Sequence, residues 1–164
     1  MNISESKRKY ILLGIVAFIV IGLITAKVLA SKQDEQFLND DLLYQQAGQL
    51  LQEGNIADAS IVVKELLESQ PQSEMVNYLA GMIAAQTEDY KQSAILFQKT
   101  LDINPHKVED TMFMLQFGEI LVLAERYDDA KIVLERCSTS GWAPEEFPTY
   151  QERVTELLTQ IENK

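Results

Sequence analysis

The sequence predicts an all-α protein in which an apolar N-terminal helix precedes three stacked helical hairpins and a last helix. Two prolines, Pro71 and Pro105, lie 34 residues apart, and the residues before each follow one pattern of small and large side chains. Self-similarity at such a period indicates a repeat architecture. Residues 11–24 contain no polar side chain, and the C-terminal segment carries a single apolar stripe at helical spacing. These three observations define the expected elements.

The N-terminal segment predicts a membrane anchor. Residues 10–30 reach the length of about 20 mostly apolar residues that a spanning helix needs, provided that Lys27 extends its ammonium to the interface. A cleaved secretory signal peptide is the alternative, because it also combines a basic start with an apolar core. The apolar run exceeds the usual core of a signal peptide, which favours an uncleaved transmembrane helix.

The charges that flank this segment predict its orientation. Lys7, Arg8 and Lys9 precede the apolar run, whereas Lys27 and Lys32 flank its far end. The more basic flank usually stays in the cytoplasm. We therefore expect a cytoplasmic tail over residues 1–9, a spacer over residues 31–39, and an extracytoplasmic, periplasmic location for the remainder in a bacterial inner membrane. The inverted topology is the alternative.

Small and large residues recur at fixed repeat positions, counted from Asp40, Glu74 and Thr111 as position one. The eighth, twentieth and twenty-fourth positions are occupied by Ala47, Ala59 and Val63, by Gly81, Ser93 and Phe97, and by Gly118, Ala130 and Leu134. Small residues let two helices approach, and a large one fills the remaining space. The third copy starts three residues late, with the insertion around residues 106–110, and Trp142 replaces its closing proline.

This pattern resembles the tetratricopeptide repeat (TPR). The resemblance implies a right-handed α-solenoid of three helix-turn-helix repeats over residues 40–143, divided as 40–73, 74–107 and 111–143. The turns between helices are expected at Gly54 and Asn55, at Glu88 and Asp89, and at Glu125 and Arg126.

Residues 144–164 predict a capping helix. Their apolar residues are spaced at three and four, as on one face of a helix: Phe147, Tyr150, Val154, Leu157 and Ile161. Terminal repeats need a cap that hides the last apolar face. The alternative is a helix offered to a partner.

Composition excludes several functions. Beyond residue 30 the chain keeps 24 of its 25 acidic and 10 of its 14 basic residues, a net charge of −14, so a nucleic-acid partner is not expected. Cys137 is the only cysteine and His106 the only histidine, and no phosphate loop, dinucleotide turn or metal-binding motif is present. We expect no catalytic residues, no cofactor, no metal and no small-molecule substrate, and hence a protein that is not an enzyme.

The TPR resemblance also implies a concave face lined by the first helix of each repeat. None of the fifteen positions that ligands usually contact in this family is Lys or Arg, so the basic clamp of some members is absent. The residues expected to contact a partner are Tyr44, Leu51, Met75, Tyr78, Met82, Met112, Leu115 and Glu119. Methionine adapts to irregular apolar surfaces, so we expect an apolar or amphipathic protein segment there. The C-terminal helix, or the curvature of the array itself, is the alternative occupant.

Together these features favour a membrane-tethered scaffold or adaptor that acts in the assembly or maturation of an envelope complex. The arrangement is similar to that of small anchored TPR proteins of cytochrome c maturation and of the secretion translocon, which implies an extracytoplasmic chaperone as one alternative. A structural subunit of a large membrane complex is the other.

Overall fold

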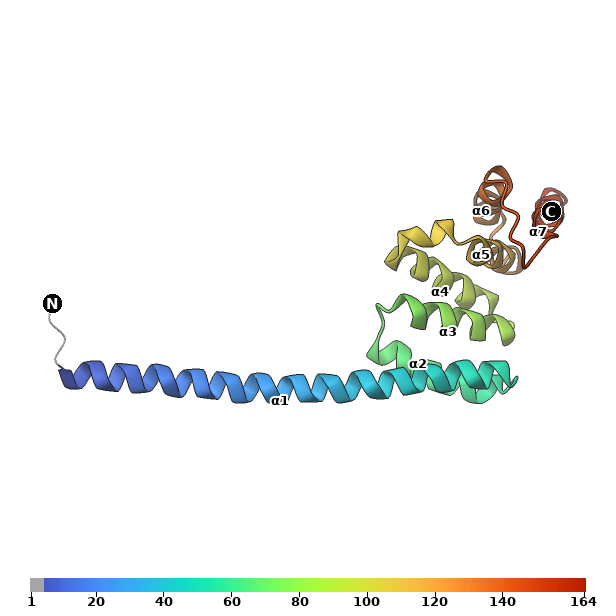
Figure 1. Ribbon diagram of the computed structural model, residues 1–164. Coiled ribbons are helices and arrows are strands. Elements are labelled where there is room, and N and C mark those ends of the chain that lie inside the picture. Colours follow the sequence, from blue (N-terminus) through green and yellow to red (C-terminus); the bar gives the residue numbers. More distant parts are fainter. Residues whose placement is uncertain (1–4) are drawn as a thin grey trace. The chain divides into compact units, whose positions relative to one another are not determined.

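The computed structural model describes the backbone of residues 5–164, together with the side chains of Ile15, of residues 18–23 and 25–27, and of all residues from Phe37 onward. The chain divides into two units, Met1–Leu42 and Leu43–Lys164. Within residues 5–164 the regular elements are all helical (Figure 1). In chain order they are α1 (Glu5–Gln52), α2 (Ile56–Ser69), α3 (Glu74–Gln86), α4 (Tyr90–Ile103), η1 (Pro105–Glu109), α5 (Thr111–Leu123), α6 (Tyr127–Thr139) and α7 (Tyr150–Glu162).

The first unit is the N-terminal part of α1. Its described apolar side chains, including Phe18, Ile21 and Leu23, are exposed. A bilayer-spanning helix requires about 20 consecutive, mostly apolar residues, and no helix in the described part of the chain meets that requirement. The expected anchor over residues 10–30, with its single-pass location in an inner membrane, is therefore wrong as a prediction. Residues 1–4 of the expected cytoplasmic tail lie outside the described residues.

The second unit contains three helical hairpins that stack on one another, with α3 packed on α2, α5 on α4 and α7 on α6 (Figure 1). We call residues 43–52 of α1, α3 and α5 the first helices, and α2, α4 and α6 the second helices. Buried side chains form two clusters: one centred on Leu66, Leu79 and Ile83, and a larger one centred on Phe97, Phe113 and Leu121.

The three hairpins turn in the same way. In each, a backbone N–H bonds to a carbonyl five residues earlier: Asn55 to Leu50 at 2.8 Å, Asp89 to Ala84 at 3.0 Å and Arg126 to Leu121 at 2.9 Å. This bond closes the end of the first helix when the preceding residue is left-handed. Gly54, Glu88 and Glu125 all have the required positive φ, at 73°, 62° and 60°. The predicted turn positions thus coincide with the observed ones.

Close approach of the paired helices explains the small residue at the eighth position. A Cβ atom on Gly81 would lie 2.7 Å from Cδ2 of Phe97, and one on Gly118 would lie 2.6 Å from Cδ2 of Leu134. The buried hydroxyl of Ser93, at the twentieth position, donates to the carbonyl of Gly81 at 2.8 Å. The predicted contact between small and large positions is therefore present in the second and third hairpins.

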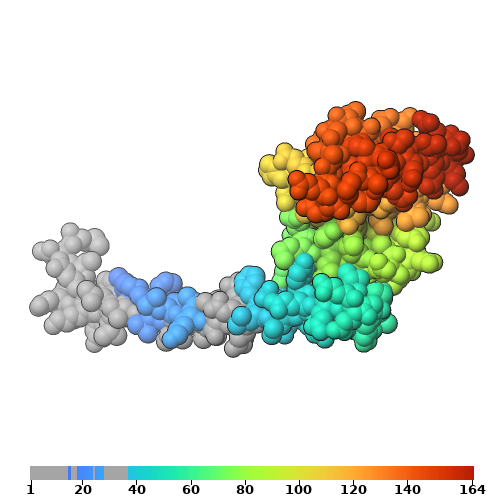
Figure 2. All heavy atoms as spheres, turned by 45° about the vertical axis from the view of Figure 1, so that its right-hand side comes forward, coloured from blue at the N-terminus to red at the C-terminus, as the bar shows by residue number. Residues whose placement is uncertain are grey.

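Two segments differ from a plain succession of hairpins. The insertion predicted around residues 106–110 forms the short helix η1, which joins the second hairpin to the third. The C-terminal helix α7 buries Tyr150, Val154 and Leu157 against α5 and α6. Figure 2 shows its atoms (red) against those of α6 (orange). Helix α7 thus covers the apolar surface that the third hairpin would otherwise expose.

Candidate partner-binding face

The eight residues predicted to contact a partner all lie on first helices, and together with Leu123 we call their surface the first-helix face. Met75 is 56% exposed, Met112 37% and Leu123 50%. Tyr44, Leu51 and Met82 are half-buried. Exposed apolar side chains therefore occur on both α3 and α5, and none of the nine residues that define this face is lysine or arginine. Such apolar exposure is typical of interaction surfaces.

Tyr78 is held by its neighbours. Its ring lies edge-on to Phe97, with centroids 5.5 Å apart, and tilted against Phe113 at 5.8 Å. Its hydroxyl donates to Oε1 of Gln116 on α5 at 2.7 Å. Burial is the main cause that raises the pKa of the Tyr78 hydroxyl above its ordinary value. Tyr78 thus stays neutral at physiological pH and links α3 to α5.

The third hairpin uses two of the predicted residues internally. Leu115 is only 3% exposed and packs in the larger core cluster. Oε1 of Glu119 accepts a hydrogen bond from Nε of Arg153 on α7 at 2.6 Å, and Arg153 also bonds to Glu156 at 3.2 Å. Hydrogen bonding to Glu119 is the first cause of the raised pKa of Arg153. Helix α7 therefore contacts the first-helix face at α5. This is the kind of contact expected if the C-terminal helix, and not a partner, occupies that part of the face.

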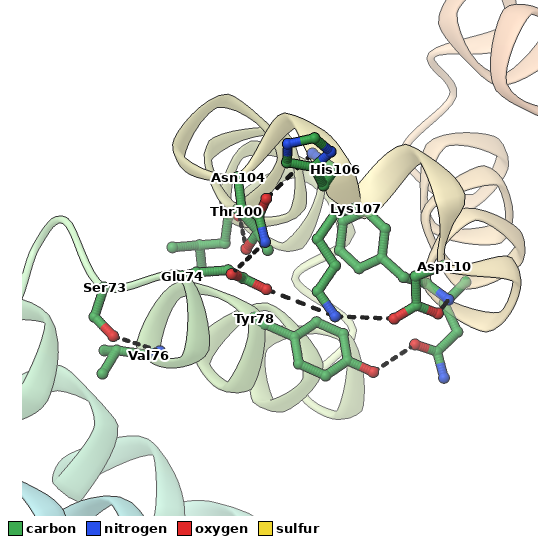
Figure 3. A network of polar contacts seen from close by, with 12 residues as sticks. Ser73, Glu74, Val76, Tyr78, Thr100, Asn104, His106, Lys107 and Asp110 are labelled. Carbon is green, nitrogen blue, oxygen red and sulfur yellow. Dashed lines mark hydrogen bonds and ion pairs between the residues drawn. The ribbon is translucent and has the colours of Figure 1, made fainter.

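A lysine that the sequence did not single out holds the junction between the second and third hairpins (Figure 3). Nζ of Lys107 lies 2.9 Å from Oδ2 of Asp110 and 3.6 Å from Oε1 of Glu74. It also lies 5.6 Å from the ring centres of Tyr78 and Phe113, within cation–π range. A lysine in an insertion has no periodic signal, so only the folded chain reveals its partners.

Asp110 has two roles at this junction. Its Oδ1 accepts the N–H of Phe113 at 3.0 Å, which caps the N-terminus of α5, while Oδ2 pairs with Lys107. Burial alone would raise the pKa of this carboxyl, but the Phe113 amide and the Lys107 ammonium outweigh it and lower the pKa. The pKa of Lys107 is raised, chiefly by its hydrogen bond to Asp110. Both groups are therefore charged at neutral pH.

Several other polar side chains of the described residues are buried in the core. Cys137 is buried, and burial is the first cause that raises the pKa of its thiol. Asn77 is fully buried and donates to the carbonyls of Pro71 and Ser73, which fixes the loop before α3. Among the described residues, no group of three or more histidine, cysteine, aspartate or glutamate side chains is placed to hold a metal ion.

Comparison with known proteins supports the repeat architecture. A family model described as TP_0855_C, C-terminal, matches residues 38–75. A search of curated proteins gives no significant match. The solved structures that resemble this chain include the Yersinia enterocolitica type III secretion chaperone SycD in complex with a peptide of the translocator YopD, which is 18% identical over 75% of this chain and 92% of that chain, with a TM-score of 0.61.

Two further structures give the same result. PcrH, in complex with the chaperone-binding region of PopD, is 14% identical over 75% of this chain and 90% of that chain, with a TM-score of 0.59. The TPR2B domain of yeast Sti1, in a pHsp70 complex, is 10% identical over 76% of this chain and 96% of that chain, with a TM-score of 0.59. At these identities the likeness shows the fold. The chain therefore has a TPR-like helical repeat fold, as the residue pattern predicts.

Proposed function

We propose that this protein is a TPR-like adaptor or chaperone that binds a segment of a partner protein on its first-helix face. The observation that carries the proposal is the exposure of Met75, Met112 and Leu123 on successive first helices of a stacked repeat array. An array of this kind presents side chains from several repeats to one ligand. The function proposed is binding without catalysis.

The similar structures support this proposal by their ligands. The SycD and PcrH structures hold a peptide of YopD and the chaperone-binding region of PopD. We propose that repeats bounded at residues 40–73, 74–107 and 111–143 serve a comparable purpose here, with residues 144–164 as the cap. Tyr44, Leu51, Met75, Tyr78, Met82, Met112, Leu115 and Glu119 remain the proposed contact set. Within this set we expect the exposed Met75 and Met112 to contribute most to binding. Leu115 is buried in the core, and Glu119 is already paired with Arg153.

Site-specific photocrosslinking of the full chain in cells tests the proposal. The photoreactive residue replaces Met75 in one variant and Ile95 in the other, and these side chains are both 56% exposed. Ile95 lies on the second helix α4 and is therefore a control with matched accessibility. We expect a discrete crosslinked product from position 75 and none from position 95. Equal products from both positions, or a product from position 95 alone, would contradict binding at the first-helix face.

A further inference from the structure

A second feature adjoins the first-helix face at the turns that end the first helices. Glu53 directly follows α1, and Glu88 and Glu125 each lie two residues beyond the last residue of α3 and α5. All three are exposed. The turns after α1 and α3 lie at the same edge of the repeat unit (Figure 1). We call these three glutamates the acidic turn edge, because one of them stands at each hairpin turn.

The charges of the acidic turn edge are not neutralised within residues 37–164. No lysine or arginine of that region forms an ion pair with any of the three carboxylates, and Glu53 only accepts a hydrogen bond from Gln49. The last turns of α1, α3 and α5 contain no basic residue. A helix C-terminus is the place where a cation is most favourable. A partner's lysine or arginine therefore fits this edge.

Other acidic residues near the turns have local roles and do not belong to this set. Asp58 accepts a hydrogen bond from the side-chain amide of Asn55, and Asp89 accepts one from the backbone N–H of Gln92. Asp129 forms an ion pair with Arg126. These are ordinary interactions at the start of a helix. Glu88 and Glu125, in contrast, occupy a left-handed position at which the first hairpin has Gly54, so turn geometry does not account for glutamate there.

The opposite end of the first helices differs in its electrostatics. Lys107 lies there, but its ammonium is already paired with Glu74 and Asp110. An acidic partner segment would thus find no unpaired cation at that junction and would meet three unpaired glutamates at the turns. The net charge of −14 over residues 31–164 repels it further.

From this charge complementarity we infer that the occupant of the first-helix face is a cationic amphipathic segment of a partner protein. Its apolar side chains contact the first-helix face where Leu51, Met82 and Leu123 lie nearest the turns, and its lysine or arginine side chains reach Glu53, Glu88 and Glu125. The inference rests on the proposed binding function and names the chemistry of its ligand.

Three synthetic peptides of equal length test the inference by fluorescence anisotropy with the full chain. They share one stripe of leucines at helical spacing and carry lysine, glutamine or glutamate at the flanking positions. We expect the lysine peptide to bind most tightly and the glutamate peptide least, with the advantage of lysine falling as salt is added. The triple variant Glu53→Gln, Glu88→Gln, Glu125→Gln should bind the lysine peptide about tenfold more weakly than the unchanged protein does. Its affinity for the glutamine peptide should stay the same.

The matched control changes the net charge equally at exposed sites elsewhere, through Glu65→Gln, Glu68→Gln and Asp102→Asn on α2 and α4. It should alter binding of the lysine peptide by less than about twofold, because these groups lie far from the turns in their helices. An equal loss in both triple variants, equal affinity for lysine and glutamine peptides, or no binding of any peptide overturns the inference. The photocrosslinking experiment at position 75 tests the proposed binding function separately. A product there without any preference for the lysine peptide would keep the binding function and overturn only the charge of the ligand.

Discussion

The first and second hairpins pack the same pair of repeat positions with different side chains. In the first, Ala47 and Val63 occupy the eighth and twenty-fourth positions and are buried in one cluster. In the second, Gly81 faces Phe97 without room for a Cβ atom. The larger residue on one helix thus accompanies the smaller residue on the other. Because interiors are close-packed, the combined volume of the pair sets the approach of the helices, more than either residue alone.

The largest expected effect comes from emptying the large position. Phe97→Ala removes a fully buried ring that also stacks on Phe113 and Phe117, so it should lower the free energy of unfolding by about 3–5 kcal/mol. Val63→Ala in the first hairpin removes less volume and should cost less. Chemical denaturation with an unchanged m-value measures both losses. Equal losses would mean that the two hairpins do not differ in this contact.

The next effect comes from filling the small position. Gly81→Ala should lower the free energy of unfolding by about 1–3 kcal/mol, because the new methyl group meets a rigid ring and overpacking outweighs the better helix propensity of alanine. Gly118→Ala should cost a similar amount, since its methyl group would lie 2.6 Å from Cδ2 and 2.9 Å from Cγ of the fully buried Leu134 side chain.

The double variant Gly81→Ala, Phe97→Val recreates the pair found in the first hairpin. Its loss should be smaller than the sum of the two single losses by more than about 0.5 kcal/mol, which a double-mutant cycle detects. Strict additivity would show that volume is not exchanged between the two positions.

A smaller, pH-dependent effect distinguishes the two inter-repeat junctions. Asp110→Asn keeps a good capping side chain but removes the charge that pairs with Lys107, so its cost at pH 7 should be under about 1 kcal/mol at this partly exposed site. The pKa of Asp110 is lowered by folding. Its charge therefore stabilises the protein above its ordinary pKa of 3.8, and that contribution is lost progressively as the pH falls from about 4 through the lower pKa of the folded state.

The first junction offers the control. Ser73 caps α3 by accepting the N–H of Val76 and has no titratable group. Ser73→Ala should cost about 1 kcal/mol independently of pH. Thermal unfolding between pH 3 and 7 compares the two variants, and an Asp110→Asn deficit that persists unchanged at pH 3 would contradict the assigned role of the charge.

The smallest effect concerns the turns. Replacing Glu125 with Gly relieves a left-handed non-glycine residue and should stabilise the protein by up to about 1 kcal/mol. Gly54→Glu should destabilise the first hairpin by a similar amount. Because both positions are exposed, the change in melting temperature reports backbone strain with little contribution from packing. A destabilising Glu125→Gly would instead assign a structural role to that carboxylate.

Much of the repeat unit was predictable because its signals are periodic. The hairpin turns, the small residues at the eighth position and the apolar stripe of α7 each recur at fixed spacings, and helix geometry converts spacing into contact. Lys107 and Arg153 have no periodic signal, since their partners Glu74 and Glu119 lie more than 30 residues away in sequence. The burial of Leu115 and the pairing of Glu119 were missed for the same reason, because α7 is a part of their surroundings.

For the N-terminal segment, in contrast, composition alone led to a wrong prediction. Its composition predicts a membrane span, but a span also needs a helix of sufficient length and apolarity, and the described residues provide none. Composition and order of residues by themselves determined the helical repeat, its turns, its cap and the absence of lysine and arginine from the nine positions that define the first-helix face. Tertiary structure decided which of the predicted contact residues remain exposed and which charges are already paired, because burial and ion pairing depend on segments that are distant in the chain.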